Sequence, residues 1–143
     1  MGRVRTMIVV ADADAIVAQI YTSDSNHPEA VKTAKLLEKN NARVIYPRTA
    51  ILEAVTVLQT KLNDQDAARG TALHFTNPAL EIIETSSEVY STAFKKYFIP
   101  TKSKKNTLFD CIVAAIAEEY GADAIFSFDH FYKNKGFKLA SEI

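Results

Sequence analysis

Single acidic residues interrupt four apolar stretches of this 143-residue chain. The four are Asp12, Glu53, Asp110 and Asp129, and each has aliphatic or aromatic residues close by on both sides. An ionised carboxylate in apolar surroundings is costly unless a cation or hydrogen-bond donors meet it. Carboxylate oxygens are also the ligands that Mg²⁺ and Mn²⁺ prefer. We therefore expect the four acids to converge on a divalent cation.

Each acid also has an ordinary structural interpretation. Asp110 stands three residues after Thr107, which is the spacing of a capping box. Glu53 is expected in the first turn of its helix, where the helix dipole favours an acid. Asp12 and Asp129 each follow an expected strand, so a turn or an N-cap would suit them. A capping acid needs no apolar residues on both sides, so a shared site explains the four together and capping does not.

The acids and their neighbours resemble the PIN domain, a family of metal-dependent ribonucleases. The resemblance extends from about Met7 to Leu139 and rests on four motifs in order: Val9-Val10-Ala11-Asp12, Leu52-Glu53, Phe109-Asp110 and Ser127-Phe128-Asp129. It implies a Mg²⁺- or Mn²⁺-dependent endoribonuclease that hydrolyses RNA phosphodiester bonds and leaves a 5′-phosphate and a 3′-hydroxyl.

The resemblance also implies a role for each motif residue. Asp12, Asp110 and Asp129 would hold the metal, either directly or through water. Glu53 would complete the site as a further ligand or as the base that positions the water. Ser127 would orient Asp129 or that water.

Asp14 departs from the family pattern, which commonly has Ser, Thr or Asn two residues after the first acid. It would either add a fifth acid to the site or cap the following helix. The run Asp12-Ala13-Asp14 also fits the opening motif of haloacid-dehalogenase-type phosphatases, in which Asp12 would be a nucleophile. That family needs another acid soon after its last motif, but the next acid after Asp129 is Glu142. A second alternative is a PIN module that binds RNA or protein without cleaving, and it predicts a missing acid.

A basic run precedes the Asp110 helix and contains Lys102, Lys104 and Lys105. Such runs are usually solvated surface, but this one lies directly before the acidic site. We expect these three lysines to hold the phosphate backbone of an RNA substrate. The formal net charge of the whole chain is zero, so any basic surface must be local.

The size of the chain favours a small member of the family, similar to the ribonuclease toxins of toxin–antitoxin pairs (VapC-like). That resemblance implies an antitoxin protein as partner and a possible homodimer. Cys111 is the single cysteine, so no disulfide can form within the chain. No apolar run reaches the roughly 20 residues of a membrane span, and the N-terminus lacks a signal-peptide core. We expect a cytoplasmic protein without a membrane partner.

Strands alternate with helices along the chain. Short apolar runs predict strands over 7–11, 43–46, 80–83, 123–126 and 137–140, and the segments between them predict helices. This alternation predicts one α/β domain over 1–143, with a parallel sheet covered on both faces in three layers. The resemblance implies five strands in the order 3-2-1-4-5. The strands before Asp12 and Asp129 would then be neighbours, with both acids at the carboxyl edge where such sheets carry their sites.

Overall fold

The computed structural model describes residues 5–143, so residues 1–4, which are part of the N-terminal segment used above, lie outside the described range. The strands form one parallel sheet in the order β3-β2-β1-β4. Val10 lies at the centre of this sheet, opposite Ile45 and Ile125. The strands are β1 (Ile8–Ala11), β2 (Arg43–Pro47), β3 (Glu81–Ile83) and β4 (Ala124–Phe126).

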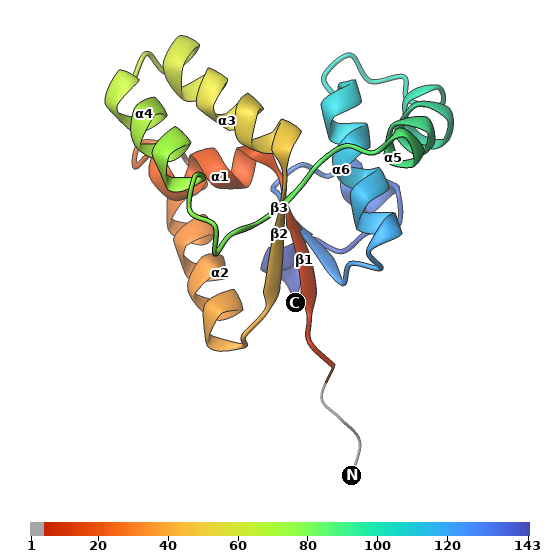
Figure 1. The fold of residues 1–143 in the computed structure, drawn as a ribbon, viewed down its shortest axis with the longest axis horizontal. Coiled ribbons are helices and arrows are strands. Elements are labelled where there is room, and N and C mark those ends of the chain that lie inside the picture. Colours follow the sequence, from red (N-terminus) through yellow and green to blue (C-terminus); the bar gives the residue numbers. More distant parts are fainter. Residues whose placement is uncertain (1–4) are drawn as a thin grey trace.

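Helices connect the strands and cover both faces of the sheet (Figure 1). After Thr92 the fifth helix continues as a π-helix, η1 (Ala93–Phe98). A short 3₁₀ turn, η2 (Ala140–Glu142), ends the chain. The α-helices are α1 (Ala13–Ile20), α2 (His27–Lys39), α3 (Arg48–Thr60), α4 (Gln65–His74), α5 (Ser87–Thr92), α6 (Leu108–Glu119) and α7 (Phe131–Asn134).

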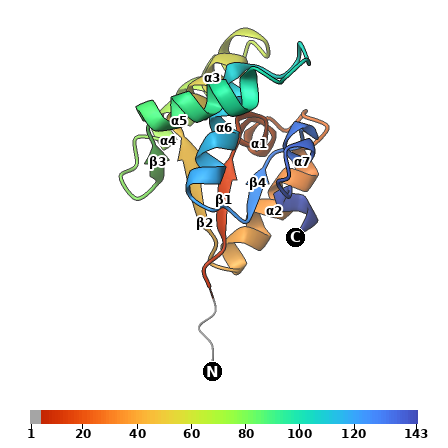
Figure 2. The same ribbon diagram turned by 90° about the vertical axis from the view of Figure 1, so that its right-hand side faces the viewer.

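The predicted fifth strand over 137–140 is wrong, and only a parallel bridge between Leu139 and Ile125 remains in its place. The Ile125 N–H donates to the Lys138 carbonyl at 2.9 Å, so the segment does lie beside β4 as the order 3-2-1-4-5 requires. It cannot extend, because the Phe137 N–H is bound to the Tyr132 carbonyl on one side and η2 begins at Ala140 on the other. Figure 2 shows this last segment next to β4.

The three-layer arrangement is confirmed by the alternation of side chains along β1. Val10 packs in the core cluster that contains α6, whereas Val9 and Ala11 pack in the cluster that contains α2. In Figure 1 the sheet is nearly edge-on, with α2 on one side and α6 on the other. Residues Cys111 to Ala117 of α6 are all buried, which fits their apolar sequence. Among residues 5–143, no helix combines the length and the apolar character needed to cross a membrane.

Local signals fix both ends of α6. At its start the Thr107 N–H donates to the Asp110 carboxylate at 3.1 Å in the predicted capping box. At its end Gly121 has a φ of 58°, and the Ala122 N–H donates to the Ala117 carbonyl at 2.9 Å. This is a Schellman motif, which places glycine at the left-handed position.

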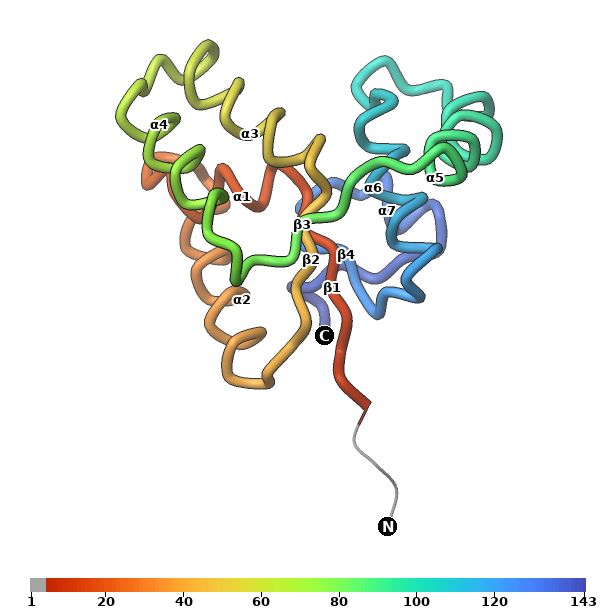
Figure 3. Tube along the Cα trace, viewed as in Figure 1, coloured from red at the N-terminus to blue at the C-terminus, as the bar shows by residue number. Residues whose placement is uncertain are grey.

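The pairing of β1 with β4 positions the site. Asp12 follows β1 and Ser127 follows β4, and the Asp12 N–H donates to the Phe126 carbonyl at 3.0 Å. The carboxyl ends of all four strands lie at the same edge of the sheet, because the strands are parallel. The tube in Figure 3 shows α1 and α3 leaving from this edge. The residues that follow β1 and β4 are therefore close together in space.

Candidate metal centre

Three acidic residues from distant parts of the chain meet at this edge. Asp12, Glu53 and Asp110 each offer a carboxylate oxygen, and these oxygens all lie within 4.8 Å of one another. All three line a cavity of about 440 Å³ together with Asp14 and Asp129. The structure thus brings together the four acids expected from the sequence, and it adds Asp14 to them.

Asp12 forms the floor of the cavity, with only 4% of its surface exposed. It is the N-cap of α1, and its Oδ1 accepts a hydrogen bond from the Ala13 N–H at 2.7 Å. Its Oδ2 accepts one from the Tyr132 hydroxyl at 2.6 Å. Burial, and then the nearby charge of Asp14, raise the pKa of Asp12 well above its ordinary value. Its ionised form therefore needs positive charge nearby.

Glu53 is the least restrained of the acids. It is the sixth residue of α3, so the prediction that it lies in the first turn and serves the helix dipole is wrong. Its carboxylate has no hydrogen-bond partner among residues 5–143. Burial, followed by the charges of Asp110 and Asp14, raises its pKa to about 7. The preceding residue, Leu52, is 58% exposed, so Glu53 lies at the border between core and solvent.

Asp110 serves α6 and the cavity at the same time. Its Oδ2 accepts hydrogen bonds from the Thr107 N–H at 3.1 Å and from the Asn106 side chain at 3.2 Å. Burial raises its pKa, and these bonds act against the rise. The capping interpretation of Asp110 is therefore confirmed, and the same carboxylate also lines the cavity.

Asp129 is held by its own loop and by the segment before α6. Its Oδ1 accepts a hydrogen bond from the Phe131 N–H at 2.9 Å, and its Oδ2 accepts one from Asn106 Nδ2 at 2.8 Å. The same Asn106 nitrogen also donates to Asp110, so one amide fixes the two acids relative to each other. Asp129 lines the cavity but is not one of the three acids within 4.8 Å.

Ser127 lies beneath the cavity and connects Asp14 to Asp129. Its hydroxyl donates to Asp14 Oδ2 at 3.0 Å and accepts from the Asp129 N–H at 3.0 Å. The Phe128 N–H donates to the same Asp14 oxygen at 2.8 Å. Burial raises the pKa of Asp14 to about 6. Asp14 is not the N-cap of α1, and it joins the first turn of that helix to the loop after β4.

The partners of the cavity acids are all neutral. Backbone N–H groups, hydroxyls and an amide meet them, whereas each of the five ion pairs among residues 5–143 uses an acid elsewhere. Converging carboxylates without a paired cation leave negative charge unbalanced. Oxygen ligands at this spacing fit a hard divalent cation such as Mg²⁺ or Mn²⁺. The acids in those five pairs are Asp123, Glu81, Glu84, Glu118 and Glu142.

Two lysines approach the cavity from its rim. Lys105, expected from the basic run, lines it, but Lys102 and Lys104 do not. Lys61 lines it as well, and sequence reasoning missed this residue because it stands alone at the end of α3. The basic character at the cavity therefore comes from two elements rather than from one run.

Sequence reasoning also gave no role to Asn106 or Tyr132. Both are buried, and both donate to cavity carboxylates. Asn106 is the residue just before Thr107, the N-cap of α6. In the sequence, Tyr132 looks like an ordinary aromatic residue of the core. Neither carries a charge that would stand out in an apolar segment.

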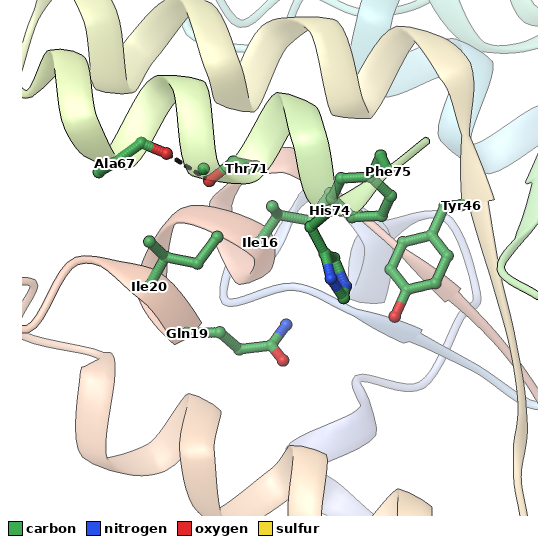
Figure 4. A pocket seen from close by; sticks show the side chains of 9 residues that line it. Ile16, Gln19, Ile20, Tyr46, Ala67, Thr71, His74 and Phe75 are labelled. Atoms are coloured by element: carbon green, nitrogen blue, oxygen red, sulfur yellow. Dashed lines mark hydrogen bonds between the residues drawn. The ribbon is translucent and has the colours of Figure 1, made fainter. Parts of the chain in front are cut away.

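A second pocket, of about 320 Å³, lies between α1, β2 and α4 (Figure 4). The rings of Tyr46 and Phe75 meet edge to face at its wall, with centroids 5.0 Å apart, and Ile16 and Ile20 complete its apolar side. No carboxylate lines it. Of these two pockets, the acidic cavity is therefore the one that gathers carboxylates.

The comparisons with known proteins agree with this geometry. The family model described as "PIN domain" matches residues 9–138. No curated protein gives a significant match to the chain.

Solved structures share the fold at low sequence identity. VapC20 of Mycobacterium tuberculosis, described as a sarcin-ricin loop cleaving toxin, has a TM-score of 0.76 at 16% identity and covers 90% of this chain and 95% of its own. FitAcB of Neisseria gonorrhoeae has a TM-score of 0.64 at 14% identity and covers 92% and 95%. VapBC2 of Rickettsia felis, bound to a DNA fragment from its promoter, has a TM-score of 0.63 at 18% identity and covers 93% and 97%.

Proposed function

This chain belongs to the PIN domain family, and on that premise we propose that it is a metal-dependent endoribonuclease that hydrolyses RNA phosphodiester bonds. One observation supports the proposal above the others. Carboxylates from the residue after β1, from α3 and from α6 approach within 4.8 Å of one another, and each is met by neutral donors or by none. Carboxylates this close together repel one another when ionised, and a bound cation would relieve that repulsion.

Asp12, Glu53 and Asp110 would hold a Mg²⁺ or Mn²⁺ ion. When bound, such an ion lowers the pKa of water and stabilises negative charge on phosphate oxygens. Asp129 lines the cavity but is not one of the three acids within 4.8 Å of one another, so we assign it a role through water. Glu53 has no hydrogen bond to restrain it, which also suits it to receive a proton from the attacking water. Ser127 holds the backbone of Asp129 in place.

The substrate must bring negative charge to an acidic cavity, so it needs cations at the rim. Lys105 and Lys61 both line the cavity, and we assign them contacts with RNA phosphates. Lys102 and Lys104 would contact more distant phosphates, because they are exposed and lie outside the cavity.

The phosphatase alternative is less well supported. In that reading Asp14 would act next to a nucleophilic Asp12, but both Asp14 oxygens accept hydrogen bonds from Ala15, Ser127 and Phe128. It also gives no reason for Glu53 and Asp110 to approach Asp12. A non-cleaving module is likewise less well supported, because every acid of the cavity is present.

We further propose that the enzyme is a VapC-like toxin with an antitoxin protein as partner, and that it forms a homodimer. The support is the similarity of fold to VapC20 and VapBC2 over nearly the whole chain. Growth arrest on expression, relieved by co-expression of a small neighbouring gene, would test the toxin role. Unaffected growth despite active ribonuclease would favour RNA processing instead.

The enzymatic test is cleavage of a fluorescent single-stranded RNA with Mg²⁺, Mn²⁺ or EDTA. We expect cleavage with metal only, and a loss of at least about 100-fold in Asp12→Asn, since even residues that merely support a metal ligand cost 10- to 100-fold when replaced. Asp66→Asn is the matched control, because Asp66 is exposed on α4 and does not line the cavity. Cleavage that continues in EDTA, or that is equal in Asp12→Asn, would contradict the proposal.

A further inference from the structure

Tyr132 is the largest fully buried side chain of the described residues, with 0% of its surface exposed. Its hydroxyl donates to Asp12 Oδ2 at 2.6 Å. A phenylalanine would fill the same apolar space without the need to satisfy a buried hydroxyl. The hydroxyl therefore calls for an explanation beyond packing, and it donates to an acid of the cavity.

We propose that Tyr132 is a positioning residue whose hydroxyl holds the Asp12 carboxylate in the orientation that binds the divalent cation. The inference rests on the proposed function, because it assumes a metal at Asp12. Tyr132 itself does not line the cavity. It reaches Asp12 from the protein side, so the cavity side of the carboxylate stays free for the ion.

The two hydrogen bonds on Asp12 do different things. The bond from the Ala13 N–H comes from the next residue, so it moves with Asp12 and cannot fix it relative to other elements. The Tyr132 bond spans 120 residues and ties the end of β1 to α7. The loop just before α7 carries Asp129, which its own bond from Phe131 holds in place. Tyr132 therefore fixes Asp12 relative to the segment that presents Asp129.

A tyrosine suits this position because it is a neutral donor. A lysine or arginine bonded to Asp12 would cancel the charge that attracts the cation and would compete with it. A tyrosine hydroxyl ordinarily keeps its proton at neutral pH, so it is a hydrogen-bond donor there. The Tyr132 hydroxyl also lies near the Asp110 carboxylate. It has a single proton, which it donates to Asp12 Oδ2 at an oxygen–oxygen distance of 2.6 Å. Supporting hydrogen bonds of this kind orient metal ligands in many proteins.

The test compares Mn²⁺ binding by calorimetry in the wild type, Tyr132→Phe and Tyr97→Phe. Tyr97 is the matched control, because it is 4% exposed and its hydroxyl lies 3.3 Å from a carboxylate outside the cavity, that of Glu118. We expect the Mn²⁺ dissociation constant to rise about 10- to 100-fold in Tyr132→Phe and to stay unchanged in Tyr97→Phe. Circular dichroism and urea unfolding of the metal-free proteins show whether each variant is folded.

The outcomes separate the inference from the function on which it rests. Failure of the wild type to bind Mn²⁺ would remove the proposed function. Equal Mn²⁺ affinity in the wild type and a folded Tyr132→Phe would overturn the inference alone, even if the variant were less stable.

A second measurement needs only the wild type, in case Tyr132→Phe does not fold. No tyrosine lines the cavity within residues 5–143, so a metal ion there can perturb tyrosine absorption most directly through the Asp12–Tyr132 bond. We expect Mn²⁺ to produce a tyrosine ultraviolet difference spectrum that saturates together with the calorimetric binding. Saturation with Mn²⁺ without any such spectrum would overturn the inference.

Discussion

At the scale of single residues, the ionised carboxylates of the cavity repel one another, and a bound cation would relieve this repulsion. Burial is the main cause of the raised pKa values of Asp12, Asp14, Glu53 and Asp110, and the charges of neighbouring acids raise those of Asp12 and Glu53 further. These residues are favourable to the fold when protonated and unfavourable when ionised without a metal. The metal-free protein should therefore be most stable on the acid side of neutrality.

Glu53 allows this to be tested. Its pKa is 4.5 in the ordinary state and about 7 in the fold, so between these values the folded protein binds more protons than the unfolded chain. The free energy of unfolding then falls as pH rises through this window. In EDTA we expect Glu53→Gln to match the wild type at about pH 5 and to be more stable at about pH 8, measured by urea unfolding. Glu29→Gln, exposed on α2, is the control. If the free energy of unfolding of Glu53→Gln differed from that of the wild type by the same amount at both pH values, the raised pKa of Glu53 would be contradicted.

The acids of the site could be predicted from the sequence because charge in an apolar segment is visible without a structure. The position of Glu53 in its helix was wrong, because Pro47 and Arg48 begin α3 earlier than a first-turn acid requires. Asn106 and Tyr132 could not be predicted. Their hydrogen bonds to Asp129 and Asp12 span 23 and 120 residues of the sequence. A neutral polar residue also does not stand out in an apolar segment as a charged residue does.

At the scale of elements, the strands and helices follow the predicted alternation, and the sheet order 3-2-1-4 is confirmed. Ser86 is the N-cap of α5, and its hydroxyl accepts a hydrogen bond from the Val89 N–H at 3.1 Å. The predicted fifth strand does not form, because Phe137 is bonded to Tyr132 of α7 and the turn η2 begins at Ala140. Only Leu139 is left to pair with Ile125 of β4. Such competition between tertiary contacts and local pattern is not encoded in residue types alone.

Two glycines give a matched test of the helix ends. Gly121 has a φ of 58°, whereas Gly70 lies inside α4, and a Cβ at either would meet nothing within 4 Å. Gly121→Ala should lower the free energy of unfolding by about 1 kcal/mol, because a side chain disfavours the left-handed region. Gly70→Ala should raise it by roughly 0.5–1 kcal/mol through helix propensity. Urea unfolding of both variants measures this, and a change of the same sign in both would refute the assignment of Gly121 as the residue that ends α6.

At the scale of the whole molecule, a chain of zero net charge must bind a polyanion through local charge. In the proposed function, Lys61 and Lys105 at the cavity rim would supply this local charge. The predicted single domain over 1–143 and the homodimer remain predictions.

Salt dependence of RNA binding tests the role of the rim lysines. In EDTA, which prevents cleavage, the logarithm of affinity should fall linearly with the logarithm of salt concentration. Lys61→Gln and Lys105→Gln should each reduce the slope by about 0.7, the value for one phosphate contact on a single strand. Lys39→Gln, at the far end of α2, should leave the slope unchanged. Fluorescence anisotropy measures the affinities, and an equal loss in Lys39→Gln would mean that the whole surface binds RNA without a preferred site.

The bonds from Ser127 to Asp14 and from Tyr132 to Asp12 join residues 113 and 120 positions apart. During synthesis, Asp12 and Glu53 emerge long before the segments that complete their surroundings. At roughly 5–20 residues per second, Tyr132 is synthesised several seconds or more after Asp12. The hydrogen bonds around the acidic cavity can therefore be complete only after translation has passed Tyr132.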